Sequence, residues 1–287
     1  MKTSSFAQPY KLSIVTPSYN QGQFLEETIC SVLDQKYQNL EYIIIDGGSK
    51  DNSIEIIKKY EKHLKYWVSE KDHGQAEAIN KGFRQCTGDI MAWINSDDLY
   101  FSDAFQYVND FFCNSKNLNV GMIYGDAWIV DANNEFIMHR KELPFDRWMG
   151  MLIGFGLLIP QPAAFWRRSV YEAVGLLKEN LHYCLDSDYW SRISKTFRIQ
   201  HANKYLAKAR YHADAKTNLL FKGNTRKGYD ELNQELEASY TSFAISKIVK
   251  FKYSSIIRKS YRIKRILMRA VLGHYFWDYK TAWKQVK

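Results

Sequence analysis

The sequence has few cysteines and no hydrophobic run long enough to cross a membrane. Its four cysteines, Cys30, Cys86, Cys113 and Cys184, lie far apart, without a CxxC pair or a histidine at zinc-ligand spacing. This pattern excludes a zinc knot and a disulfide framework, and it favours a reducing cytoplasm. No run of about 18 apolar residues occurs, and no stretch of signal-peptide length precedes Leu12. We therefore expect a cytoplasmic protein without a membrane span.

Linkers are also missing. No stretch rich in Pro, Gly or Ser divides the first 220 of the 287 residues, and neither an internal repeat nor a low-complexity tract occurs. Hydrophobic residues make up 46% of the chain and charged residues 25%, as in folded domains with a sizeable core. We expect one folded domain over residues 1–220 and a tail over residues 221–287.

Acidic residues are almost absent from the end of the tail, and this decides where the net charge of +9 lies. Between Lys247 and Lys287 there are twelve Lys or Arg and one acidic residue, Asp278, so this segment carries +11 and the residues before it carry −2. A nearly neutral main part argues against a large face for nucleic acid. We expect no nucleic-acid partner.

The first hundred residues alternate short β-branched runs with helical patterns, which is typical of βαβ units. Strand-like segments occur at Leu12–Thr16, Glu41–Asp46, Tyr66–Ser69 and Asp89–Asn95. Later segments at 122–130, 136–140 and 205–211 also read as strands, and those at 168–174 and 188–195 read as helices. The sequence therefore predicts an α/β fold with a Rossmann-like, mostly parallel central sheet flanked by helices.

Each of the first four strands ends in polar residues. The four ends read Thr16-Pro17-Ser18-Tyr19-Asn20, Asp46-Gly47-Gly48-Ser49, Ser69-Glu70-Lys71-Asp72 and Asn95-Ser96-Asp97-Asp98. Ligands of open parallel sheets bind beyond the carboxyl ends of the strands, so these residues are candidates for a common site. The alternative is that Asp and Gly only terminate the strands.

The fourth strand is apolar until it reaches two adjacent carboxylates, Asp97 and Asp98. Two carboxylates at the end of a buried strand are costly unless a positive charge lies beside them. Mg²⁺ and Mn²⁺ prefer oxygen ligands and leave room for substrate phosphate, so a divalent cation is the candidate cofactor. A solvated turn is the alternative.

Four segments together resemble the successive motifs of family 2 glycosyltransferases, which have the GT-A fold. They are Ile14–Asn20, Tyr42–Ser53, Asp72–Phe83 and Trp93–Asp98, and the similarity covers roughly residues 11–215. The resemblance implies a nucleotide-sugar half at about 1–100 and an acceptor half at about 101–220. It also implies metal-dependent, inverting transfer of a sugar from a nucleotide diphosphate, most often UDP in this family, to a hydroxyl of a saccharide or lipid-linked saccharide in bacterial surface polysaccharide or glycolipid synthesis.

The resemblance also assigns residues to the donor site. The loop after the first strand would pack on the base, the acid ending the second would hydrogen-bond it, and the first Asp of the pair would face the ribose. The expected nucleotide-sugar-binding residues are Thr16, Pro17, Tyr19, Asp46, Asp72, Gly74, Gln75, Asn80, Lys81, Ser96 and Asp97. Among them, Gly74 would allow close backbone approach at a helix N-terminus, whereas Lys81 fits a surface lysine equally well.

Two metal ligands are expected, Asp98 and, from the segment Tyr211–Lys216, His212. A lone histidine is otherwise often just a hydrogen-bonded surface or core residue.

An inverting transfer needs a general base for the acceptor hydroxyl. The family places it in an acidic motif that opens a helix, and the segment Leu185–Arg192 occupies that place, with Leu185 where Glu is common. We expect Asp186 to be the base and rank Asp188 second; either one fits a helix cap instead. On the acceptor side, Gln161 and Trp166 are expected to contact sugar, although an aromatic residue in a strand is more often in the core.

The tail has an amphipathic pattern. Ile256, Ile263, Leu267 and Ala270 lie on one helical face, and Arg258, Arg262, Arg265 and Arg269 lie on roughly the opposite one. A basic helix followed by aromatic residues suits an anionic membrane surface, so residues 245–287 predict peripheral binding at the inner face of the cell membrane. The alternative is that the apolar face packs on the domain or on another subunit.

Two other functions fit parts of the pattern. A nucleotidyltransferase also joins a Rossmann-like sheet to a metal and a nucleotide, but Thr16–Gly22 lacks the Gly-rich, basic phosphate loop of that class. A noncatalytic nucleotide-sugar or carbohydrate-binding relative would keep the fold without transfer.

Overall fold

The computed structural model describes residues 9–148, 150, 158–213 and 215, and eight residues between 259 and 270. Most of the predicted tail, including Arg258, Arg262, Arg265 and Arg269, lies outside the described residues. The division of the chain at residue 220 therefore stays a prediction.

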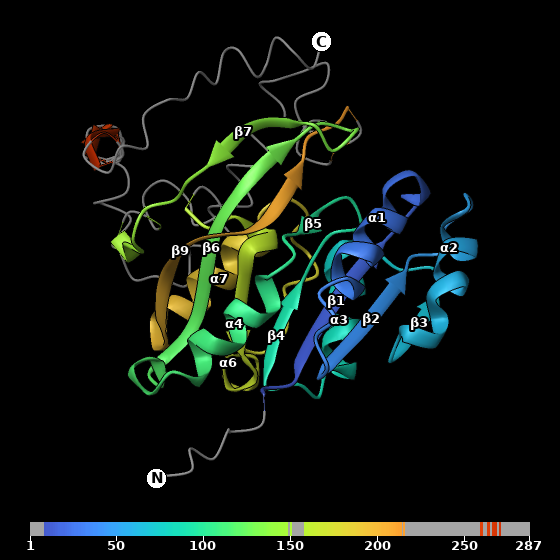
Figure 1. Cartoon of the computed structure of the whole chain (residues 1–287), viewed down its shortest axis with the longest axis horizontal. Coiled ribbons are helices and arrows are strands. Elements are labelled where there is room, and N and C mark those ends of the chain that lie inside the picture. Colours follow the sequence, from blue (N-terminus) through green and yellow to red (C-terminus); the bar gives the residue numbers. More distant parts are fainter. Residues whose placement is uncertain are drawn as a thin grey trace.

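The described strands form one nine-stranded sheet with the order β3-β2-β1-β4-β8-β6-β9-β5, and β7 pairs with β6 (Figure 1). Their bounds are β1 Leu12–Ser18, β2 Leu40–Asp46, β3 Tyr66–Ser69, β4 Ile90–Trp93, β5 Leu99–Tyr100, β6 Val120–Val130, β7 Phe136–Arg140, β8 Ala164–Arg167 and β9 Arg198–Arg210. β1 to β4 are mutually parallel, as are β6 and β9. The predicted mostly parallel α/β sheet is confirmed.

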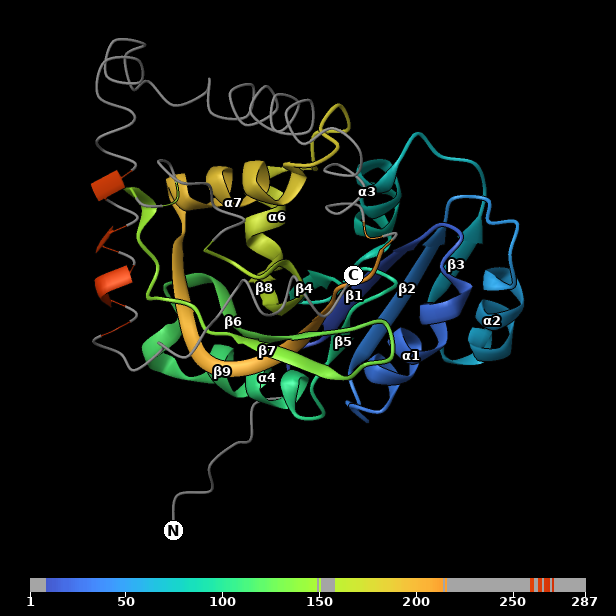
Figure 2. The same cartoon turned by 90° about the horizontal axis from the view of Figure 1, so that it is seen from above.

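Helices cover both faces of the sheet (Figure 2). α3, α6 and α7 lie along one face, and α1 and α4 lie along the other, where α2 packs beside α1. The bounds are α1 Gly22–Leu33, α2 Ser53–Tyr60, α3 Gln75–Gln85, α4 Ala104–Cys113, α6 Arg168–Val174 and α7 Leu185–Thr196, with short 3-10 turns η1 Glu61–His63, η2 Ser115–Asn117 and η4 Gln161–Ala163.

β9 is longer than its sequence predicts. The prediction started at residue 205, but the strand begins at Arg198 because β6 pairs with it from Val120↔Arg198 to Val130↔Arg210. Its first residues are mostly polar and lack a strand pattern, so the pairing rather than the local propensity sets the start.

The centre of the core is a cluster of large rings. Phe83, Trp93, Trp166, Tyr189 and Trp190 are all 0% exposed. Trp93 and Trp190 stack with ring centroids 5.2 Å apart, and Phe83 meets Trp166 edge to face at 5.7 Å. Burying each such side chain contributes on the order of 1.5–3 kcal/mol. The cluster fixes α3 and α7 against β4 and β8.

The contact of α3 with the sheet requires a glycine. A Cβ at Gly82 would lie 2.3 Å from Cγ1 of Val15 on β1. Any larger side chain would therefore push the helix away from the strand.

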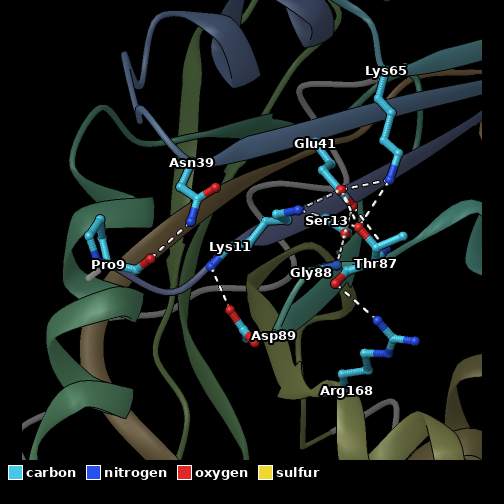
Figure 3. A network of polar contacts seen from close by, with 10 residues as sticks. All are labelled: Pro9, Lys11, Ser13, Asn39, Glu41, Lys65, Thr87, Gly88, Asp89 and Arg168. Carbon is cyan, nitrogen blue, oxygen red and sulfur yellow. Dashed lines mark hydrogen bonds and ion pairs between the residues drawn. The ribbon is translucent and has the colours of Figure 1, made fainter. Parts of the chain in front are cut away.

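The amino-terminal ends of β1 and β2 are joined by a buried polar network around Glu41 (Figure 3). The Glu41 carboxylate accepts hydrogen bonds from Ser13 Oγ at 2.6 Å, Lys65 Nζ at 2.6 Å and Thr87 N at 2.9 Å. Ser13 Oγ in turn accepts one from Gly88 N at 2.9 Å. The network thereby ties both strands to the loop between α3 and β4.

The eight described residues between 259 and 270 are helical. Lys264 Nζ lies 2.7 Å from Asp146 Oδ2, and Met268 packs against the core, whereas Ile263, Ile266 and Leu267 are more than half exposed. In the part of the chain that the structure describes, no helix combines the length and hydropathy needed to cross a membrane.

Candidate active site

The carboxyl ends of β1, β2 and β3 meet at one edge of the sheet. Their register pairs Ser18 with Asp46 and Asp46 with Ser69. Asp46 is completely buried, and its carboxylate accepts hydrogen bonds from Ser49 Oγ at 2.5 Å, Ser49 N at 2.9 Å and Ser69 Oγ at 2.6 Å. Ser49 Oγ accepts one from Asn20 N at 2.8 Å, so the loops after β1 and β2 are held together.

Three further predicted donor residues lie on the first of these loops or just before it. Thr16 is buried, with Oγ1 at 3.0 Å from the Tyr42 hydroxyl, and Pro17 is buried beside it. Tyr19 is 58% exposed. A large ring left exposed next to buried Asp46 suits stacking on a planar base. Thr16 and Pro17 are instead buried within β1, just before the loop.

Asp97 and Asp98 follow β4 at the same edge. Asp98 is 6% exposed, and it accepts hydrogen bonds from Arg210 N to Oδ1 at 2.9 Å and from Asn95 Nδ2 to Oδ2 at 3.3 Å. Its backbone oxygen accepts a bond from Thr28 Oγ1 at 2.9 Å. Burial, and then the charge of Asp97, raise the pKa of Asp98 well above its ordinary value. The pair is therefore held in place, and nearby positive charge does not outweigh the burial of Asp98.

The end of β9 lies beside this pair. The Arg210 guanidinium donates to the Asp97 backbone oxygen at 2.9 Å and to Glu27 at 2.6 Å, and it lies 4.8 Å from the Phe24 ring centroid. His212 Nε2 is 3.0 Å from Asp97 Oδ2, and its ring packs 4.5 Å from that of Phe24. The predicted ligands Asp98 and His212 thus flank Asp97.

The amino terminus of α3 is tied to the same carboxylates. Gln75 Nε2 donates to Asn95 Oδ1 at 2.8 Å, and Asn95 contacts Asp98 as described above. Gly74 precedes the helix with φ of 129°, a value that favours glycine, and no atom lies within 4 Å of a Cβ built there. Asp72 Oδ1 accepts a bond from Gly74 N at 2.9 Å, and burial raises the pKa of Asp72.

Two predicted donor residues on α3 have other partners. Asn80 is completely buried, and its amide bonds the backbone of Leu177 through both Nδ2, at 3.0 Å, and Oδ1, at 2.9 Å. Its side chain fastens α3 to the loop after α6 and does not face the donor site. The Lys81 ammonium lies 2.9 Å from Glu70 and 3.0 Å from Glu77, so it is paired within the fold.

The two base candidates on α7 have different surroundings. Asp188 is 1% exposed and accepts hydrogen bonds from Lys178 Nζ and Arg192 Nε, both at 2.7 Å. Asp186 is half-buried, and its Oδ1 accepts a bond from Ser187 N at 2.6 Å. Asp186 also lies one turn before Trp190, on the same helix face, and Trp190 stacks on Trp93 at the end of β4. The role of Asp186 as the base stays a prediction.

The two predicted acceptor residues are both partly or wholly inside. Gln161 is half-buried, and its Nε2 donates to the Trp93 backbone oxygen at 2.8 Å. Trp166 is 0% exposed and packs against Phe83, Trp93 and Trp190. The prediction that Trp166 contacts a sugar is therefore wrong for this structure, because the residue is completely buried and packs in the core.

The sequence assigned no role to Arg210, Asn95 or Ser49, which hold the acidic residues in place. Arg210 had a weak signal, since it lies two residues before the predicted ligand His212. Asn95 and Ser49 carried no signal beyond their position near a strand end.

A divalent cation fits the residues of this edge. Within the described ranges, no three His, Cys, Asp or Glu side chains are grouped as a complete metal site. Mg²⁺ and Mn²⁺, however, need only one or two protein carboxylates when a diphosphate completes the shell. The buried Asp98, with its raised pKa and only one long hydrogen bond to Oδ2, is the side chain that such an ion would suit.

Comparison with known proteins assigns the family. The profile for glycosyl transferase family 2 matches residues 13–175, more than half of the chain. The chain belongs to glycosyl transferase family 2. A glycosyltransferase of Rickettsia bellii is 28% identical over 247 residues, which are 81% of this chain and 33% of that protein, so this chain spans about a third of that relative's length. A Bacillus subtilis protein named for teichuronic acid biosynthesis, TuaG, is 37% identical over 100 residues, 33% of this chain and 39% of that protein.

Solved structures of glycosyltransferases show the same fold. Staphylococcus aureus TarS in complex with UDP-GlcNAc superposes with a TM-score of 0.57 at 16% identity, covering 84% of this chain and 76% of that one. The mannosyltransferase PcManGT of Pyrobaculum calidifontis, in complex with GDP-Man and Mn²⁺, gives 0.54 at 14% identity, covering 96% and 92%. This family 2 chain therefore has the GT-A fold.

Proposed function

We propose that this chain is a metal-dependent, inverting glycosyltransferase that transfers a sugar from a nucleotide diphosphate, most simply UDP, to a saccharide hydroxyl. The observation that supports this most strongly is the meeting of Asp46, Asp97, Asp98 and His212 at one sheet edge, next to the open amino terminus of α3. TarS with UDP-GlcNAc and PcManGT with GDP-Man and Mn²⁺ share the fold, and TuaG supports a role in surface polysaccharide synthesis.

The donor would lie across the ends of β1, β2 and β4. Tyr19 would stack on the base above buried Asp46, and Asp97 would face the ribose. Asp98 and His212 would hold a divalent cation, which supplies charge to offset the negative charge that develops on the departing diphosphate. Gly74 lets the backbone at the start of α3 approach the phosphates, where the helix dipole favours negative charge.

Asp186 would act as the general base. In a direct displacement, its carboxylate accepts the proton of the acceptor hydroxyl while the oxygen of that hydroxyl bonds to the anomeric carbon and the bond to the diphosphate breaks. Asp188 is unsuited to this role, because both of its oxygens accept hydrogen bonds from cationic side chains. Gln161 lies near the end of β4 on the acceptor side and is proposed to contact the acceptor.

A panel of nucleotide sugars tests the proposal. With Mn²⁺ or Mg²⁺, we expect one donor, a UDP-sugar, to be hydrolysed or transferred well above the others, and we expect chelation with EDTA to stop the reaction. Asp186→Asn should abolish transfer but keep binding of UDP, with Asp110→Asn, an exposed acid on α4, as the matched control. Failure of every donor, with or without metal, would contradict transfer. Retention of the anomeric configuration in the product, measured by NMR, would contradict the single-base scheme.

We also propose that the enzyme binds an anionic inner membrane surface through residues 245–287. The described part of this segment supports the idea, since Ile263, Ile266 and Leu267 are exposed on a helix that also carries Lys264. Flotation with anionic vesicles should recover the wild type and lose the double variant Ile263→Ser/Leu267→Ser. Equal recovery of both would contradict membrane docking.

A further inference from the structure

A second group of aromatic side chains lies away from the candidate active site, on β6, β7, β9 and the loop before α4. Five rings form it, and we call this group the aromatic platform: Phe101, Trp128, Phe136, His139 and Tyr205. Trp128 is at its centre, with ring centroids 4.9 Å from Phe136, 5.0 Å from Phe101 and 5.9 Å from His139. Tyr205 completes it, 5.4 Å from His139.

Strand register brings these rings to one face of the sheet. Trp128 on β6 is paired with His139 on β7 and with Lys208 on β9. Directly paired residues point to the same side of a sheet, and so do residues two apart on a strand. The β6–β9 register places Tyr205 opposite Asp126, two residues before Trp128. The platform is therefore a continuous surface across three strands.

The platform is open to solvent and carries positive charge. Phe136 is 46% exposed, His139 is exposed, and the other three rings are half-buried. Lys208 Nζ lies 5.7 Å from the centroid of Phe101 and 6.0 Å from that of Trp128, and Lys141 Nζ lies 5.7 Å from that of Tyr205. The hydrogen-bond acceptor of Lys208 is neutral, Asn134 Oδ1 at 3.2 Å, so its charge is not cancelled by that contact.

The same strands lead from the platform to the active-site edge. Lys208 is two residues before Arg210, whose backbone N–H donates to Asp98. Trp128 is two residues before Val130, the partner of Arg210 in the β6–β9 ladder. Two residues of strand span roughly 7 Å, so a chain of linked sugars that lies on the rings reaches the edge where transfer would occur.

We propose that the aromatic platform binds an anionic saccharide chain, namely the acceptor chain at sugars remote from the hydroxyl that reacts. The assignment of the ligand as the acceptor rests on the proposed function. The C–H face of a sugar ring packs on an aromatic ring, while its polar rim takes hydrogen bonds from neighbouring side chains. Here Lys208 and His139 stand around the rings as donors, and the Lys208 ammonium group is complementary to carboxylate or phosphate groups on the chain.

Binding of defined oligosaccharides to the full chain tests this inference. The probes are hexagalacturonate, which is anionic, and cellohexaose, which is neutral, measured by titration calorimetry. Phe136→Ala/His139→Ala should weaken hexagalacturonate binding about tenfold through lost ring contacts. Lys208→Gln should weaken hexagalacturonate but leave cellohexaose unchanged. Leu118→Ala removes an exposed apolar side chain outside the platform and should change neither.

Three results would overturn the inference. The first is unchanged hexagalacturonate binding in Phe136→Ala/His139→Ala. The second is that these substitutions abolish binding to anionic lipid vesicles instead, and the third is that they convert a dimer to a monomer without affecting saccharide binding. Asp98→Asn separates this inference from the proposed function: it should lose donor turnover and keep hexagalacturonate binding. Donor turnover that survives in Asp98→Asn would refute the proposed transfer mechanism, while the platform variants would still decide the saccharide site.

Discussion

Each edge of the parallel half of the sheet contains a buried carboxylate, and the pKa values of the two carboxylates are shifted in opposite directions. At the amino-terminal edge, Glu41 is 7% exposed and is surrounded by donors, among them Lys65. Burial alone would raise the pKa of Glu41, but hydrogen bonds from Lys65, Ser13 and Thr87 outweigh it and lower the pKa to about 2. At the carboxyl-terminal edge, Asp98 is just as buried, and its pKa is raised by burial and by Asp97.

The difference separates a structural carboxylate, Glu41, from Asp98, the carboxylate that we propose binds a cation. Glu41 is neutralised from within the fold and has no capacity left for a ligand. Asp98 is oriented by Arg210 N and Asn95, but these hydrogen bonds and the charge of Arg210 do not outweigh its burial and the neighbouring Asp97. Such a site destabilises the protein on its own and gains from a cation brought with the substrate.

The largest expected effect is the loss of activity in Asp98→Asn. Removing the carboxylate that we propose binds the cation should lower the transfer rate about a thousandfold, while the free energy of unfolding at pH 8 stays equal or increases. The sign follows from the raised pKa of Asp98: the folded state holds this proton more tightly than the unfolded chain, so ionisation at higher pH costs stability, and an amide avoids that cost.

Donor turnover and urea unfolding measure the two parts of this prediction, with Asp103→Asn as the control acid at the surface. Mn²⁺ with UDP should raise the melting temperature of the wild type and leave that of Asp98→Asn unchanged. If Asp98→Asn lost stability and kept activity, Asp98 would be a structural carboxylate like Glu41, and the proposed role of Asp98 would be contradicted.

Asp188→Asn should show the opposite effects, a loss of stability without a loss of activity per folded molecule, although Asp188 is only two residues from the proposed base. Asp188 is 1% exposed and bridges Lys178 and Arg192, and Arg192 also donates to the backbone oxygens of Val174 and Leu176 at 2.8 Å. Loss of one partner of a buried pair should cost about 3 kcal/mol of unfolding free energy. Urea denaturation measures it, and Asp186→Asn, which should stay within about 0.5 kcal/mol of wild type, is the matched control.

Glu41→Gln should have a smaller effect on stability and almost none on turnover per folded molecule. The amide still accepts a hydrogen bond from Ser13 or Thr87, and Lys65 is partly exposed and regains water, so we expect a loss of about 2 kcal/mol. Chemical denaturation and donor turnover should be measured on the same preparation. A large fall in turnover without a fall in stability would show that the amino-terminal edge takes part in function.

The sequence was sufficient to predict that acidic residues lie at the carboxyl-terminal edge, because their placement depends on local order. A β-branched run that ends in Asp46 or in Asp97–Asp98 places the acid at a strand end, and parallel strands bring their ends together. The main feature of the fold, a mostly parallel sheet, could be predicted from the same alternation of strands and helices.

Residues that depend on distant partners could not be predicted in this way. Asn80 resembles a polar residue on the donor side of a helix, but its partner Leu177 is 97 positions away. The sequence allows Trp166 either to contact a sugar or to lie in the core, and only the packing of Trp190 against it distinguishes the two positions. Likewise, the motif ranks Asp186 above Asp188 by position alone, and the physical difference between them depends on Lys178 and Arg192, which lie around Asp188.

The smallest expected effect is a pH dependence of the unfolding free energy, which should have opposite signs for Glu41 and Asp98. The pKa of Glu41 is lowered from 4.5 to about 2 by folding, so its stabilising contribution is present above pH 4.5 and is lost as the pH falls toward 2. The difference in unfolding free energy between wild type and Glu41→Gln should therefore be constant from pH 7 to 5 and shrink below 4.5. For Asp98→Asn the difference should instead grow in favour of the variant as the pH rises above the ordinary range of an aspartate. Urea titrations at a series of pH values measure both, and a Glu41 difference that is as large at pH 2.5 as at pH 7 would mean that packing, not charge, accounts for the loss in Glu41→Gln.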